Sequence, residues 1–262
     1  MTGVERRPDS LTWVGHATAL VDIDGYRVLT DPLLRKRVAH LRRRGAVPNA
    51  AALRPDLVLI SHAHIDHLHV PSLRLVDASV PVIAPLGTRD LLRRSGFEHV
   101  IEAVAGDRIK VERATIDVTP AVHPSGRGPH TRIDPRPLGF LIEVGGHRTY
   151  FAGDTDLFDE MAGFAGVDLA LLPIWGWGAT IGEGHLDPER AIRATELIRP
   201  GLVVPVHWGT YAPEDFRREP RWLTLPGLEF DRLAATRETA RSVVLTPGST
   251  LALPDRSTHD EP

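Results

Sequence analysis

Apolar and polar positions alternate in short runs along the first third of the chain, which predicts a β-rich start followed by strands and helices together. The expected strands cover residues 11–14, 18–23, 26–30, 57–60 and 80–84. Short helices are expected at 71–77, with Pro71 in the first turn, and at 88–95, before Gly96. The basic segment 34–48 shows no clear periodicity.

The rest of the chain continues the mixture of strands and helices. Further strands are predicted at residues 108–111, 115–121, 138–144, 147–151, 167–173 and 202–206, with a final hairpin at 242–253. Residues 188–198 read as a helix capped by Asp187. This order predicts a single α/β domain over residues 1–262, with two sheets between helical layers and flexible tails at 1–10 and 255–262.

Composition narrows the class of protein. The chain has 262 residues, of which 42% are hydrophobic and 25% charged, as in ordinary globular proteins. Its net charge of −3 gives no reason to expect nucleic acid or an anionic membrane as a partner. With no cysteine, disulfide scaffolds and cysteine-rich zinc motifs are excluded. No signal-like stretch or run of roughly 20 apolar residues is present, so we expect a cytoplasmic protein without a membrane span.

The segment SHAHIDHLHV crowds candidate metal ligands just after the apolar run 57–60. His62, His64, Asp66 and His67 stand at fixed offsets that a strand end or a solvated loop does not require. Three more residues of the same type, His123, Asp154 and His207, each follow another predicted strand. Because parallel strands end at one edge of a sheet, all seven side chains are expected to meet there.

The number of these residues bears on the kind of metal site. Seven groups exceed the four ligands of a tetrahedral zinc ion, and they suit two divalent ions that share a carboxylate. Imidazoles and carboxylates favour zinc, with manganese and iron as alternatives.

These motifs resemble those of the metallo-β-lactamase fold superfamily over nearly the full chain. The resemblance implies an αββα sandwich of two mixed sheets flanked by helices. It also implies that His62, His64 and His123 hold one metal, that Asp66, His67 and His207 hold the other, and that Asp154 bridges them.

Five further stretches are similar to the hydrolase branch that contains N-acyl-phosphatidylethanolamine phospholipase D and L-ascorbate-6-phosphate lactonase. They are WVGHAT, LTDP, YFAGDT, GHLDPERA and HWGTY. The cysteine ligand of the commonest true β-lactamases is missing. The resemblance therefore implies a metal-dependent hydrolase other than these β-lactamases.

Residues beside the ligand motifs are candidates for catalysis. His185 is expected to face the substrate and to polarise the scissile group or protonate a leaving group, or else to hold the loop before the helix at Pro188. For His16 a structural role and a catalytic one stay open, and Thr155 is expected to orient Asp154. The other histidines are expected at the surface.

Two groups of residues are candidates for substrate binding. Arg127, Arg132 and Arg136 lie on the loop that follows His123 and would clamp a phosphate, or form a solvated rim. Trp175 and Trp177 follow the strand at 167–173 and would form an apolar wall, or cover the edge of the sheet.

The resulting hypothesis is a dinuclear hydrolase that uses a metal-bound hydroxide, with Asp66 and Asp154 orienting it and His185 assisting the leaving group. The expected substrate is a small anionic molecule, most readily a phosphodiester. A lactonase or another ester or amide hydrolase is the alternative, and a non-catalytic metal-binding protein is a third. The complete ligand set argues against the third. A homo-oligomer is compatible with the sequence.

Overall fold

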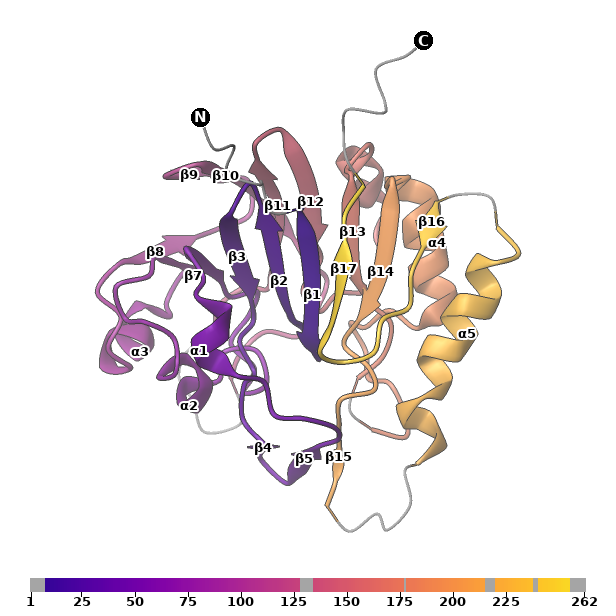
Figure 1. Cartoon of the computed structure of the whole chain (residues 1–262), viewed down its shortest axis with the longest axis horizontal. Helices are drawn as coiled ribbons and strands as arrows, with labels where there is room; N and C mark the ends of the chain where they lie inside the picture. The colour runs from indigo at the N-terminus through magenta and orange to yellow at the C-terminus, as the bar shows by residue number, and fades with distance from the viewer. Residues whose placement is uncertain (1–7, 128–133, 177, 215–219, 238–239, 255–262) are drawn as a thin grey trace, which may run out of the picture.

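Two mixed β-sheets face each other across an apolar core in the computed structural model, which describes residues 8–127, 134–176, 178–214, 220–237 and 240–254 (Figure 1). The core is filled from both sheets, by Trp13 and Val21 of one and by Phe140 and Leu171 of the other. The predicted tails lie largely outside the described residues, although Ser10 already begins the first strand.

The first sheet joins the two ends of the described chain. Its seven strands, in spatial order, are β17 (Ser249–Ala252), β1 (Ser10–Gly15), β2 (Thr18–Ile23), β3 (Tyr26–Thr30), β6 (Leu57–Leu59), β7 (Val82–Pro85) and β8 (Val100–Ala103). The strands from β3 to β8 run parallel, and the others are antiparallel. Of these seven strands, only β8 lies in a segment where no strand was predicted.

The second sheet is built mainly from the later half of the chain. Its seven strands, in spatial order, are β16 (Arg241–Ser242), β14 (Leu202–Val206), β13 (Leu169–Pro173), β12 (His147–Phe151), β11 (Leu138–Val144), β10 (Ala114–Pro120) and β9 (Arg108–Val111). The strands from β12 to β16 run parallel. Since β11 is antiparallel to both of its neighbours, β10 points the same way as β12.

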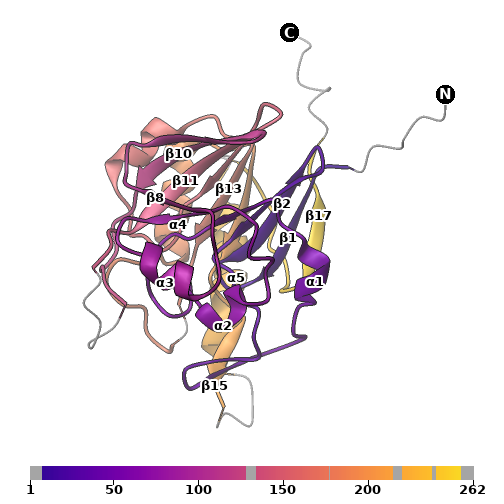
Figure 2. The same cartoon turned by 90° about the vertical axis from the view of Figure 1, so that its left-hand side faces the viewer.

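Helices cover the outer faces of both sheets (Figures 1 and 2). The first sheet carries α1 (Ala50–Leu53), α2 (Val70–Leu73) and α3 (Arg89–Arg94), each burying a leucine against it. The second carries α4 (Pro188–Ile198) and α5 (Leu225–Ala234), with two 3₁₀ turns, η1 (Asp159–Phe164) and η2 (Arg221–Leu223). This αββα order confirms the predicted fold. None of the described helices is long and apolar enough to cross a membrane.

The predicted helix at 188–198 shows how the sequence sets a boundary. Asp187 accepts a hydrogen bond from the Arg190 backbone N–H at 2.8 Å, and Pro188 occupies the first turn, where no N–H is needed. Ala191, Ile192 and Ala194 of the same helix are buried, so its apolar side seals the second sheet.

One prediction about pairing is wrong, and one segment for which no element was predicted forms strands. The expected hairpin at 242–253 does not form, because β16 pairs with β14 in the second sheet while β17 pairs with β1 in the first. The basic segment 34–48 forms β4 (Arg37–Val38) and β5 (Leu41–Arg43), which join β15 (Tyr211–Pro213) in a small third sheet. An alternating pattern marks a strand, but its partner depends on residues far away in the chain.

Strand direction brings the candidate residues to one rim. Asp31 follows β3 and His62 follows β6, while His123, Asp154 and His207 follow β10, β12 and β14. The strands that precede these residues within each sheet point the same way. The candidate site therefore lies where the ends of the two sheets meet.

Candidate metal centre

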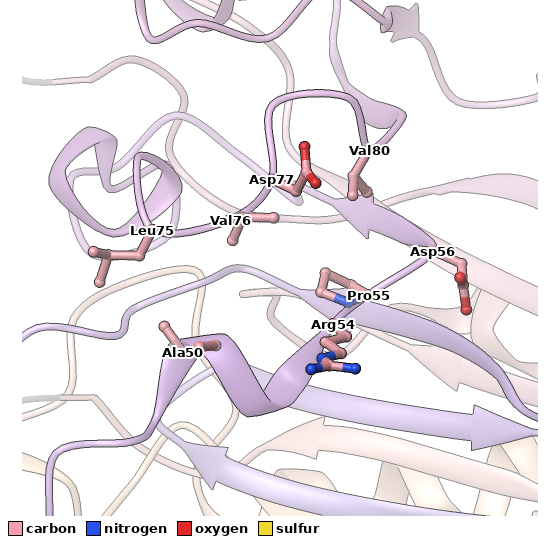
Figure 3. Close-up of a pocket in the computed structure, with 9 residues that line it drawn as sticks. Ala50, Arg54, Pro55, Asp56, Leu75, Val76, Asp77 and Val80 are labelled. Carbon is pink, nitrogen blue, oxygen red and sulfur yellow. The ribbon is translucent and has the colours of Figure 1, made fainter.

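All seven predicted ligands gather at this rim, together with His16, Asp31 and His185. They form overlapping groups whose ligand atoms lie within 4.8 Å of one another: His62, His64 and His123; His16, Asp66, His67 and His207; Asp31, His62 and His67; and His123, Asp154 and His185. The site is identified by this cluster of histidine and aspartate side chains and not by the volume of a cavity. An open cavity of about 600 Å³ lies elsewhere, between α1 and the segment after α2, beside Arg54, Leu75 and Asp77 (Figure 3).

One half of the site consists of three imidazoles. The Nε2 atoms of His62 and His123 each lie 3.0 Å from Nδ1 of His64. Burial lowers the pKa of all three rings, and it lowers that of His123 to about 4, so they are neutral near pH 7.

Hydrogen bonds behind this half fix which nitrogen carries the proton. Nδ1 of His123 donates to the Gly184 carbonyl at 2.7 Å. The Ser61 hydroxyl donates to Asp31, so it accepts from Nδ1 of His62 at 2.9 Å. Both Nε2 atoms are therefore bare acceptors that point at the same atom of His64. A single proton on His64 can serve one of them, whereas a cation can bind all three nitrogens.

The other half combines imidazoles with carboxylates. Nε2 of His67 and Nε2 of His207 are 3.1 Å apart, and each lies 3.2 Å from Oδ2 of Asp154. Oδ2 of Asp66 lies 3.5 Å from Nε2 of His67 and 3.8 Å from Nε2 of His207. Nδ1 of His67 donates to Asp31 at 2.7 Å, and Nδ1 of His207 donates to the Trp175 carbonyl at 2.8 Å. Both rings therefore turn Nε2 toward the carboxylates.

A proton on His67 offsets part of the negative charge in this half. Burial disfavours the charged carboxylates, but His207 and His67 hold the pKa of Asp154 well below its ordinary value, and His67 does the same for Asp66. Burial also disfavours a charged His67, yet the carboxylates Asp154, Asp66 and Asp31 raise the pKa of this ring well above its ordinary value. A divalent cation between these atoms would take the place of that proton.

Asp154 gives the sharpest sign that a cation fits. Its Oδ1 atom is buried and, among the described residues, finds no hydrogen-bond partner. A buried carboxylate oxygen left without a partner is costly, and native proteins rarely contain one without a functional reason. The residues present therefore fit divalent metal ions.

The site is partly exposed at His185, His64 and His123, whereas Asp154 and His207 are buried. The His185 side chain is 17% exposed, against 3% for Asp154 and 1% for His207. Its Nε2 lies 3.5 Å from Oδ2 of Asp154, and Nδ1 donates toward the carbonyls of Glu183 and Gly182 at 3.0 and 3.2 Å. Burial opposes protonation, but the bond to Asp154 raises the pKa of His185 above its ordinary value. The ring can thus hold a proton where a substrate would enter.

Asp31 is the site residue that the sequence analysis missed. It is fully buried and accepts hydrogen bonds from the Ser61 N–H at 2.7 Å, from the Ser61 hydroxyl at 2.5 Å and from His67 at 2.7 Å. The signal was present in LTDP, a carboxylate directly after a strand, like Asp154. Asp31 thus holds the ligand-bearing segment 61–70 at two points, Ser61 and His67.

The predicted arginine and tryptophan residues fall in different surroundings. Arg127 is half-buried and donates through one nitrogen to the carbonyls of Ala63 and Leu68 at 3.0 and 2.8 Å, so it braces the loop that carries the ligands. Arg136 is exposed. Trp175 is half-buried, and its indole donates to the Gly178 carbonyl at 3.0 Å. Arg132 and Trp177 lie outside the described residues.

Two expectations about other residues are wrong. Thr155 does not orient Asp154, because its hydroxyl donates to the Asp156 carbonyl and accepts from the Val122 N–H at 2.9 Å, which holds the segment leading to His123. His69 and His147, expected at the surface, are buried.

Comparisons with known proteins agree with this geometry. Residues 26–208 match the β-lactamase superfamily domain. The chain is 35% identical over 257 residues to an uncharacterised protein of Mycobacterium tuberculosis. The match covers 91% of this chain and 66% of that protein, so this chain spans just under two thirds of the relative's length. It is 34% identical over 251 residues to a UPF0173 metal-dependent hydrolase of Opitutus terrae, covering 92% of this chain and 98% of the relative.

One solved structure is similar to nearly the whole of this chain. Igni18, a metallo hydrolase from the archaeon Ignicoccus hospitalis, superposes with a TM-score of 0.72 at 26% identity and covers 95% of this chain and 100% of that one.

Proposed function

This chain belongs to the metallo-β-lactamase superfamily, and we propose that it is a hydrolase that holds two divalent metal ions, zinc before manganese or iron, and cleaves a small anionic substrate. The observation that carries the proposal is the buried Oδ1 atom of Asp154, which lacks a hydrogen-bond partner among the described residues.

The two halves of the site divide the ligands. His62, His64 and His123 would hold one ion, Asp66, His67 and His207 the other, and Asp154 would serve both. Divalent ions bound there would lower the pKa of water and polarise the scissile group. The two buried carboxylates, Asp66 and Asp154, offset the charge of the ions.

His185 has the position of a proton donor. Its Nδ1 is held by the Glu183 and Gly182 carbonyls, and Nε2 of this partly exposed side chain lies 3.5 Å from Oδ2 of Asp154. A protonated Nε2 would donate to the leaving group as the bond breaks.

Arg127 supports an anionic substrate. Within the described part of the chain, no carboxylate lies within ion-pair distance of its guanidinium, and burial lowers its pKa. A half-buried cation without an acidic partner beside the ligand loop attracts an anion, and a phosphodiester offers the oxygens that a guanidinium binds best. The half-buried Trp175 favours the second candidate, an uncharged lactone or ester.

Metal analysis and a substrate panel test the proposal. Protein purified without chelator and then loaded with zinc, manganese or iron should retain about two ions per chain and hydrolyse chromogenic phosphodiesters faster than lactones of similar size. One ion or none after loading would refute the dinuclear site. Turnover of lactones alone would favour the second candidate. Two ions without turnover of any phosphodiester, ester, amide or lactone would favour a metal-binding protein.

A further inference from the structure

His16 stands at the tip of the β1–β2 hairpin and reaches into the centre, although it belongs to neither predicted ligand set. It is 2% exposed. Its backbone is left-handed, with φ of 56°, and follows Gly15, with φ of 128°. A side chain at Gly15 would collide with Arg43 at 2.7 Å and with Thr210 at 2.9 Å, so glycine is required for the hairpin to lie here.

Three hydrogen bonds hold the backbone of His16. Its N–H donates to the Thr210 hydroxyl at 2.8 Å. Its carbonyl accepts from the Trp13 indole at 2.8 Å and from the N–H of His207 at 2.9 Å. The last bond links two residues of left-handed conformation, since φ of His207 is 63°. Non-glycine residues adopt this conformation at a cost, and such strain is concentrated at functional sites.

The imidazole of His16 faces two predicted ligands. Its Nε2 lies 2.8 Å from Oδ2 of Asp66, and its ring lies 3.9 Å from the ring of His207, centroid to centroid. An ionised carboxylate can only accept, so Nε2 of His16 is the donor. The ring of Tyr211 also packs edge-on against the ring of His16, with centroids 5.9 Å apart.

The distances separate a supporting role from metal ligation. Nε2 of His67 and Nε2 of His207 lie 3.1 Å from each other and 3.2–3.8 Å from the Oδ2 atoms of Asp66 and Asp154, the spacing of ligand atoms around one ion. The shorter 2.8 Å from His16 to Asp66 is the length of a charge-assisted hydrogen bond.

We propose that His16 is a positioning residue: it holds the Asp66 carboxylate by a hydrogen bond and packs against His207, so that both side chains are already oriented for the metal ion they share. This inference rests on the proposed metal centre. In this role the β1–β2 hairpin of the first sheet would orient one ligand that follows a strand of each sheet, Asp66 after β6 and His207 after β14.

Metal affinity tests the proposal without any substrate. His16→Asn removes the ring but tolerates the left-handed backbone, and His16→Gln keeps a donor of greater reach. The matched control is His147→Asn, a buried histidine at the opposite end of β12 from Asp154. Zinc affinity is measured by competition with a chromophoric chelator, and thermal unfolding of the metal-free proteins checks their folding.

We expect His16→Asn to bind zinc ~10–100-fold more weakly at one of two sites, the loss typical of a removed ligand support. His16→Gln should recover part of the affinity, and His147→Asn should match the wild type. Cobalt-loaded His16→Asn and His16→Gln should keep the wild-type pattern of visible absorption bands, because the ligand set is unchanged.

Two results would overturn the inference. Wild-type zinc affinity in both His16 variants would show that the hydrogen bond does not orient Asp66. A cobalt spectrum that reports a lost ligand would make His16 a ligand. Failure of the wild-type chain to bind metal is a different outcome, because it refutes the proposed function itself. If His16→Asn does not fold, His16→Gln and the cobalt spectrum decide.

Discussion

Replacing Asp31 by asparagine should weaken both the fold and the metal centre. The change preserves shape, and asparagine tolerates the left-handed backbone of this position, where φ is 33°. What changes is Oδ2, which accepts from the Ser61 hydroxyl at 2.5 Å and from His67 at 2.7 Å. An amide NH₂ placed there would face two donors.

The magnitude follows from these two bonds. Each hydrogen bond to a charged group contributes about 1.5–3 kcal/mol. The Ser61 hydroxyl can turn round and accept from the new NH₂, which recovers part of the loss. We expect the free energy of unfolding of the metal-free protein to fall by about 2–4 kcal/mol, which lowers its Tm by roughly 5–15 °C in a domain of this size.

The effect on metal binding comes through His67. When Nε2 of His67 binds an ion, the remaining ring proton stays on Nδ1, where asparagine would present an NH₂ group in place of the Asp31 carboxylate. The metal-binding tautomer of His67 would then face a donor in place of an acceptor, so zinc affinity at one site should fall ~10–100-fold.

Thermal unfolding with and without zinc, together with a chelator competition titration, measures both effects. The control is Asp56→Asn, a half-buried aspartate that accepts from the Arg27 N–H at 2.7 Å beside the same parallel strands. It should lose some stability and keep wild-type zinc affinity. If Asp31→Asn binds zinc as tightly as the wild type, Asp31 does not set the tautomer of His67 and the reasoning fails.

Three further predictions concern the chemistry of the site. Asp154→Asn should abolish turnover and release at least one metal ion, because the shared charge is lost; elemental analysis and a rate assay check this, and full activity would contradict it. His185→Ala should lower kcat by ~10²–10⁴-fold and keep both ions, and loss of metal would make His185 a ligand. Arg127→Gln should raise KM for phosphodiesters more than for lactones, and the effect should shrink as added salt screens the charge. The control is Arg136→Gln, which should change KM less because Arg136 is exposed. If both substitutions change KM equally, Arg127 only braces the ligand loop and does not bind the substrate.

The gathering of the seven candidate ligands was predictable because its signal is local. A cluster such as His62-x-His64-x-Asp66-His67 directly after an apolar strand has few structural explanations, and the later ligands repeat the same placement. Strand direction then does the rest, since β10, β12 and β14 all point toward one rim.

Supporting residues were harder to predict because their roles depend on contacts between distant segments. Asp31 and Thr155 both follow strands beside polar residues, yet Asp31 bonds to His67 while Thr155 bonds to Val122. The burial of His69 likewise depends on Ser72, which bonds to its Nδ1 at 2.7 Å and also accepts from the Leu34 N–H. No local pattern distinguishes these cases.

The pairing of β17 with β1 carries a cost in folding time. Ser10 pairs with Ala252 and Trp13 with Ser249, so this edge of the first sheet closes between residues almost a whole chain apart. During synthesis the outer edge of β1 exposes unpaired N–H and C=O groups while every intervening element is made. Contacts of such sequence separation form slowly, because a long loop must close before they stabilise anything. Through that interval the hairpin that delivers His16 belongs to a sheet with an open edge, the kind of surface at which nascent chains pair wrongly.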